Sequence, residues 1–266
     1  MTNKHAIHKQ FTTHYSLLTN LAFTLAETLI VMGIIGVVAA LTLPNLNSST
    51  GDKEKVAKLQ KIYSNLSDAL GRAEAVYGPV AEWCPSCPSE ENASKKFGER
   101  ILDFIKTSKI CNSSNINTCF GAYEGNRDEQ YSFEYWVQNW QPAFIFADGS
   151  SAVIYLYKQP SNLSGQGAGD VPEKQVLGWF FIDLDGNNKG KHMGGIDIFQ
   201  FLITTKGIVP VGGENYVDQF NPNGGADFLA TDWVIRTGNM DYLKVKSGKC
   251  PDGKTVLNLT TNTTCK

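Results

Sequence analysis

The longest apolar stretch of the chain lies near its N-terminus, where residues 28–51 carry no Asp, Glu, Lys or Arg. As a helix this stretch would extend roughly 36 Å at about 1.5 Å per residue, which exceeds the roughly 30 Å hydrocarbon core of a bilayer. We therefore predict one membrane-spanning helix. Because Lys4 and Lys9 precede it and the charges of residues 52–55 cancel, the positive-inside rule places the N-terminus in the cytoplasm and the remaining chain outside the inner membrane. A cleaved secretory signal is the competing interpretation.

A second pattern begins at Asp52. Apolar residues then recur at spacings of three and four, with charged residues between them, as far as Tyr77, which predicts an amphipathic helix over residues 52–77. The apolar positions are Val56, Leu59, Ile62, Tyr63, Leu66, Leu70, Ala73 and Val76. We expect this helix to continue the apolar one, although the polar residues 45–51 leave open two separate helices.

Beyond residue 80 the pattern is typical of β-strands. Residues 143–147 and 151–157 flank Asp148-Gly149, which predicts a hairpin because Asp-Gly supplies the positive φ angles of a tight turn. Further strands are predicted at residues 131–137, 176–183, 198–205 and 232–236. A sheet laid on the amphipathic helix would bury its apolar stripe. The predicted fold class is therefore α+β, with one long N-terminal helix packed on an antiparallel β-sheet head.

Composition and charge argue against several functions. The net charge is −2, and residues 1–22 hold two lysines and no acid, so the remainder is mildly acidic and does not suggest nucleic-acid binding. His192 is the only histidine outside the N-terminal stretch, which nearly excludes catalytic sites built from several histidines. No Gly-x-Ser-x-Gly elbow is present. We expect the protein not to be an enzyme.

Six cysteines in an exported chain predict disulfide bonds, because the compartments outside the inner membrane are oxidising. The simplest pair is Cys250 with Cys265, which would close a tail rich in Thr and Asn. The other four allow three connectivities that the sequence does not separate: Cys84, Cys87, Cys111 and Cys119. A redox-active pair at residues 84–87 and a four-cysteine zinc site are the less favoured alternatives.

Oxygen-bearing side chains alternate at Asp183, Asp185 and Asn187, and Asp197 follows at a distance that could close a site. This spacing could serve a hard cation such as calcium. The pattern lacks the glycine at the sixth position and the acid at the twelfth position of an EF-hand. An ordinary turn rich in Asp and Asn is therefore the favoured interpretation, and a calcium site is the alternative. No other cofactor is indicated.

Glu27 needs an explanation, because a carboxylate inside an apolar run is costly and usually has a partner. Residues 22–31, Ala-Phe-Thr-Leu-Ala-Glu-Thr-Leu-Ile-Val, resemble the N-terminal signature of type IV pilins and type II secretion pseudopilins. The resemblance implies that a prepilin peptidase cuts between Ala22 and Phe23 and that the new amino group of Phe23 is methylated. It also implies that Glu27 neutralises the N-terminus of a neighbouring subunit during filament assembly. Pro44 falls where the family has a helix-kinking proline.

The resemblance covers about residues 22–46, and Ala22 stands where the family mostly has glycine. It implies a pilin-like fold with a leader peptide (1–22), a transmembrane and filament-core helix (23–46), an amphipathic helix (47–79) and a β-rich head (80–266). Some pseudopilins of this kind also carry calcium-supported loops.

The function implied is that of a structural subunit of a type IV pilus or a type II secretion pseudopilus filament. Its partners would be the prepilin peptidase, other pilin subunits, an assembly ATPase and an inner-membrane platform protein. The head would be periplasmic, or extracellular after assembly. The alternative is a periplasmic binding domain or enzyme on a simple signal anchor. The sequence does not separate a major from a minor subunit.

Overall fold

The computed structural model describes residues 25–112, 115, 118–120, 142–161, 175–187, 192–212, 221–224 and 227–265. Within these ranges, the side chains of residues 39–49 and 161 lie outside the description. The chain separates into two compact units, with the boundary between Ser48 and Ser49.

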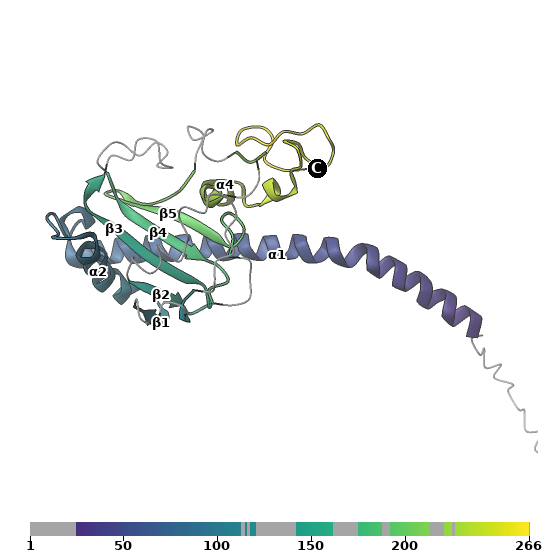
Figure 1. Cartoon of the computed structure of the whole chain (residues 1–266), viewed down its shortest axis with the longest axis horizontal. Coiled ribbons are helices and arrows are strands. Elements are labelled where there is room, and N and C mark those ends of the chain that lie inside the picture. Colours follow the sequence, from purple (N-terminus) through teal and green to yellow (C-terminus); the bar gives the residue numbers. More distant parts are fainter. Residues whose placement is uncertain are drawn as a thin grey trace, which may run out of the picture. The chain divides into compact units, whose positions relative to one another are not determined.

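Helix α1 (Leu25–Tyr77) has 53 residues and belongs to both units. Its backbone is helical through residues 45–51, where a break was the alternative expectation. The predicted end at Tyr77 is confirmed, and Gly78 terminates the helix with a φ of 78° and a bond from its N–H to the Glu74 carbonyl oxygen (2.9 Å). From Val56 onward, one face of α1 is buried against the sheet (Figure 1).

Among the helices of the described residues, none is both long and apolar enough to cross a membrane. The predicted span over residues 28–51 includes residues 39–49, whose side chains lie outside the description, and it stays a prediction.

The head contains an antiparallel sheet in which each described strand pairs with its neighbours in sequence, in the order β1-β2-β3-β4-β5-β6. The strands are β1 (Thr107–Cys111), β2 (Ala143–Phe146), β3 (Ser151–Ser161), β4 (Val176–Asp183), β5 (Ile198–Thr204) and β6 (Gly207–Pro210). The strands predicted at 143–147, 151–157, 176–183 and 198–205 are confirmed, and the predicted strand at 131–137 lies outside the described residues. The α+β class with an antiparallel sheet is therefore shown.

The predicted strand at residues 232–236 is wrong, whereas the predicted hairpin is confirmed by the pairing of β2 with β3 but has a different turn. Residues 232–236 form helix α4 (Thr231–Thr237) and not a strand, and the helix ends at Gly238 in the left-handed conformation (φ 66°). A short apolar run does not distinguish the two periods. In the hairpin turn only Gly149 has a positive φ (88°), so Asp148-Gly149 is not a two-residue turn of the expected type. Gly149 N–H instead bonds to the Phe146 carbonyl (3.1 Å), a type I turn completed by a glycine bulge.

Helix α2 (Glu90–Ile101) was not predicted from the sequence. Ser89 caps its N-terminus by accepting a bond from the Asn92 N–H (3.2 Å). Its Ser94 hydroxyl accepts a bond from the Leu156 N–H (2.8 Å), so α2 satisfies a backbone donor of β3. Short 3₁₀ helices complete the described elements: η1 (Val80–Glu82), η2 (Leu102–Phe104), η5 (Phe228–Ala230) and η6 (Asp241–Lys244).

The apolar core lies on both faces of the sheet. One cluster joins α1 and α2 to the inward side chains of β2–β5, and it includes the fully buried Leu66 and Phe180. Tyr63 of α1 stacks on Phe201 of β5 with ring centroids 5.4 Å apart. A second cluster on the opposite face includes Val153, Phe181 and the other members Cys111, Cys119, Phe120, Ala143, Val176, Trp179, Ile198, Leu202 and Val211. The packing fixes α1 from residue 56 onward to the sheet.

Candidate functional site

The N-terminal part of α1 exposes an apolar surface. Every side chain of residues 25–38 is exposed, and Glu27 in the first described turn is the only charged residue among them. The large apolar side chains of this surface are Leu25, Leu29, Ile30, Val31, Met32, Ile34, Ile35, Val37 and Val38, each at least half exposed. A helix that is apolar all round is typical of a segment buried in lipid or in other helices.

The other residues singled out by the pilin resemblance are placed only in part. Ala22 and Phe23, the predicted cleavage and methylation site, lie outside the described residues. Pro44 lies in the helical backbone of α1, and its side chain is outside the description. Cleavage, methylation and the proline kink stay predictions.

Asp183, the first of the candidate calcium ligands, stands at the end of β4 and is almost fully buried. Its Oδ1 accepts bonds from the N–H groups of Asp185 (3.0 Å) and Gly186 (3.1 Å), and its Oδ2 pairs with Nδ1 of the buried His192 (2.9 Å). Burial raises the pKa of the Asp183 carboxyl, and the bond to His192 opposes that rise. The arrangement is that of a turn held by its own aspartate.

Asp197 lies on the same loop and is 3% exposed. Its carboxylate forms an ion pair with Lys55 of α1, while Lys58 of α1 donates to the Leu184 carbonyl oxygen. Burial, followed by the charge of Asp197, raises the pKa of Asp185, so these two carboxylates are close enough to interact.

Asn187, the remaining candidate ligand, forms a hydrogen bond outside this loop. Its amide donates to the Thr118 carbonyl oxygen (3.4 Å). Within the described ranges, no group of three or more His, Cys, Asp or Glu side chains is arranged to hold a metal ion.

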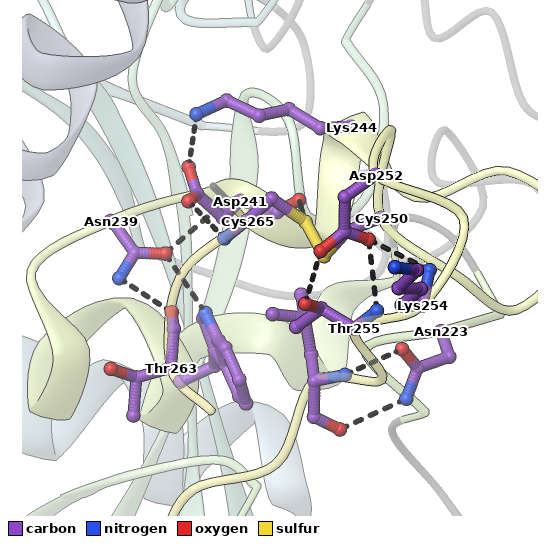
Figure 2. The surroundings of a disulfide bond; sticks show 12 residues. Asn223, Asn239, Asp241, Lys244, Cys250, Asp252, Lys254, Thr255, Thr263 and Cys265 are labelled. Carbon is purple, nitrogen blue, oxygen red and sulfur yellow. Dashed lines mark hydrogen bonds and ion pairs between the residues drawn. A yellow bond between two sulfur atoms is a disulfide. The ribbon is translucent and has the colours of Figure 1, made fainter. Parts of the chain in front are cut away.

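The structure contains three disulfide bonds among the described residues: Cys84–Cys87, Cys111–Cys119 and Cys250–Cys265. The last is the pair that the sequence favoured, and the first two give one of the three open connectivities. Figure 2 shows Cys250–Cys265 beside a turn in which the Asp252 carboxylate accepts from the Thr255 N–H (2.8 Å).

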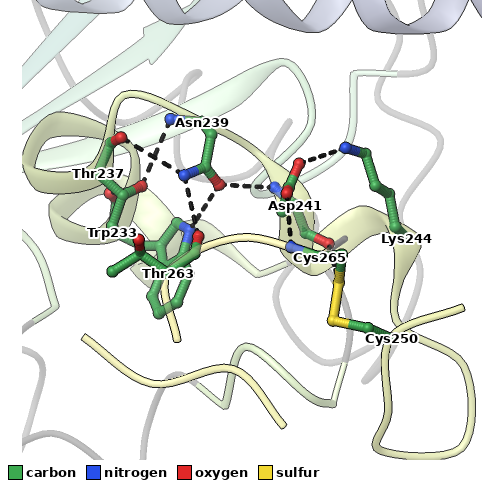
Figure 3. A network of polar contacts seen from close by, with 8 residues as sticks. All are labelled: Trp233, Thr237, Asn239, Asp241, Lys244, Cys250, Thr263 and Cys265. Carbon is green, nitrogen blue, oxygen red and sulfur yellow. Dashed lines mark hydrogen bonds and ion pairs between the residues drawn. A yellow bond between two sulfur atoms is a disulfide. The ribbon is translucent and has the colours of Figure 1, made fainter. Parts of the chain in front are cut away.

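A polar network attaches the C-terminal tail to the rest of the head (Figure 3). Asp241 Oδ2 accepts from the Cys265 N–H (2.7 Å), and its Oδ1 pairs with Lys244 Nζ (2.5 Å). Asn239 donates to the Thr263 carbonyl oxygen (3.0 Å) and accepts from the Asp241 N–H (2.9 Å). The tail is thus held by hydrogen bonds between its backbone and the side chains of Asp241 and Asn239, as well as by the disulfide bond.

No family model, curated protein or solved structure matches this chain. Its function must therefore be inferred from its own residues and their arrangement.

Replacing both Cys250 and Cys265 with serine should lower the free energy of unfolding by about 3 kcal/mol, because the bond closes a long loop in the unfolded chain. The two cysteines are 15 positions apart, whereas Cys84 and Cys87 are 3 apart. Urea unfolding of the full-length protein without reductant measures the loss. The Cys84→Ser/Cys87→Ser variant is the control, and it should lose less; equal losses in both variants would contradict the loop-closure account.

Proposed function

We propose that the chain is a structural subunit of a type IV pilus-like or type II secretion pseudopilus filament. The observation that carries the proposal is Glu27. It is the only Asp, Glu, Lys or Arg between Lys9 and Asp52, and it lies on a helical surface that is otherwise apolar and exposed.

The apolar surface of residues 25–38 favours burial, since about 25 cal/mol is gained for each Å² of apolar area removed from water. Before assembly the inner membrane would cover it, and after assembly the equivalent helices of neighbouring subunits would do so. Either environment disfavours a charged carboxylate, and an opposite charge close to Glu27 would lower that cost. The resemblance to pilins supplies one, the methylated amino group of Phe23 on a neighbouring subunit.

The second half of α1 would connect the head to the filament. Residues of α1 from Val56 to Ala73 pack in the same core as the sheet. The filament helix and the head therefore share one continuous helical backbone. The resemblance also supplies the partners: a prepilin peptidase, an assembly ATPase and an inner-membrane platform protein. The protein would have no catalytic activity of its own and would reside in the inner membrane before assembly.

The mature N-terminus tests the proposal. Protein purified from its own cells should begin at N-methylated Phe23, as read by intact mass and N-terminal sequencing. An Ala22→Glu variant, in which the small residue before the cut is replaced by a large charged one, should stay uncut and serves as the control. A chain that begins at Met1, or that is cut after the apolar run, would overturn the proposal in favour of a periplasmic domain on a signal anchor.

A further inference from the structure

Two lysines of α1 reach into the loop that the sequence marks as a calcium site. Lys55 Nζ pairs with Asp197 Oδ1, and Lys58 Nζ donates to the Leu184 carbonyl oxygen. Lys55 and Lys58 are three positions apart in α1, so both ammonium groups project from one face of the helix. Lys55 is 25% exposed and Asp197 3% exposed, so this ion pair is largely removed from water.

The oxygen atoms of the loop do not fit a calcium ion. Calcium takes six to eight oxygen ligands, mostly carboxylates and carbonyls. Here both oxygens of Asp183 are engaged, one by two backbone N–H groups and the other by His192. Asp197 Oδ1 and the Leu184 carbonyl oxygen, which would be natural ligands, face ammonium groups. A metal ion at these oxygens would be repelled by the two positive charges beside them.

We infer that the ammonium groups of Lys55 and Lys58 take the place of a metal ion in this loop. We call this pair of contacts the lysine clasp: Lys55 to Asp197 and Lys58 to Leu184. The clasp fastens Leu184 and Asp197 to α1 without calcium. It does not depend on the filament proposal, because it concerns the folding of the head alone.

The electrostatics around the clasp agree with this assignment. Burial raises the pKa of Asp185 and the charge of Asp197 adds to that rise, whereas the charges of Lys55 and Lys58 oppose it. The lysines therefore act on the loop carboxylates in the direction in which a bound cation would act. A separate hydrogen bond also holds this loop, since the Tyr242 hydroxyl donates to the Gly195 carbonyl oxygen (2.6 Å) and connects the loop to the C-terminal region.

Thermal unfolding of the full-length protein in detergent tests the clasp. Wild-type protein should have the same Tm in excess calcium and in EGTA, and calorimetric titration with calcium should show no saturable binding. Lys55→Met should lower the Tm by about 8 °C, because it leaves the Asp197 carboxylate buried without its cation. Lys58→Met should lower it less, because it removes a bond to a neutral carbonyl.

Lys61→Met is the matched control on the same helix. The Lys61 side chain is 65% exposed, and its Nζ lies 3.9 Å from Asp148 Oδ2. Because such an exposed ion pair contributes little to stability, Lys61→Met should leave the Tm almost unchanged. The double variant Lys55→Met/Asp197→Asn should be more stable than Lys55→Met alone, since it also removes the Asp197 charge that Lys55→Met leaves buried and unpaired.

Two results would overturn the inference. The first is saturable calcium binding by the wild-type protein with a rise in Tm that Asp185→Asn abolishes, because that would identify a metal site. The second is a Lys55→Met variant that unfolds like Lys61→Met, because the ion pair would then contribute nothing. Neither result bears on where the mature chain begins, so failure of the clasp is distinguishable from failure of the filament proposal.

Discussion

Replacing Glu27 with alanine is expected to remove the chain from filaments while leaving its head folded. The substitution would leave a neighbouring amino terminus without a counter-charge in an apolar environment, and breaking a buried pair in this way costs about 3–5 kcal/mol. Since about 1.4 kcal/mol changes an equilibrium tenfold, the assembled fraction should fall at least tenfold. Immunoblots of sheared filaments and of membranes from the protein's own cells measure that fraction.

Thr28→Ala is the matched control for this substitution. Thr28 is the next residue in the same exposed turn, and its hydroxyl donates to the Leu25 carbonyl oxygen within the helix (2.9 Å). Its loss should leave the filament fraction within about twofold of wild type, as expected for a neutral surface change. An unchanged thermal transition of the head in Glu27→Ala would show that folding is intact. Wild-type incorporation of Glu27→Ala would instead support a simple signal anchor.

The sequence predicted those elements whose pattern is strong and local. Strand β4 was predicted with its exact bounds because it is a bounded run of apolar residues, and all eight of its side chains are buried. The end of α1 was predicted because the apolar residues at spacings of three and four stop at Tyr77. In both cases a single stretch of chain carries the whole signal.

The elements that were missed have weaker signals. Helix α2 is largely polar, yet Ser89 before it and the buried residues Ala93, Phe97 and Ile101 at spacings of four are signals that could have found it. Strand β1 is mostly exposed, and it pairs within the described sheet only with β2, so its residues show little apolar pattern. In residues 232–236 valine and isoleucine favour a strand, whereas Gly238 just beyond them is a stop signal of a helix.

The candidate sites show the same limit. The spacing of Asp183, Asp185 and Asp197 marks a loop rich in oxygen ligands from the sequence alone. The partner of Asp197, however, is Lys55, which lies 142 positions away. Spacing within one segment cannot reveal a cation supplied by a distant helix. The lysine clasp therefore required the packed structure.

Replacing Gly178 with alanine should destabilise the head by about 3 kcal/mol or more, which is large for the addition of one methyl group. Gly178 lies in β4 opposite Leu156 of β3. A Cβ atom there would meet the Tyr155 carbonyl oxygen at 2.1 Å and the Leu156 Cα at 2.8 Å. Because both are backbone atoms of a paired strand, β3 must shift and lose bonds to β4.

The same substitution at Gly71 should act in the opposite direction. Gly71 lies on the exposed side of α1, and apart from its chain neighbours and the backbone of the same helix no heavy atom would come within 4 Å of an added Cβ. Alanine is the better helix former, so Gly71→Ala should stabilise the protein by about 0.5–1 kcal/mol. Urea unfolding of the two full-length variants compares one chemical change in two environments. If both variants shifted stability equally, the close approach of β3 to Gly178 would not be what makes glycine necessary there.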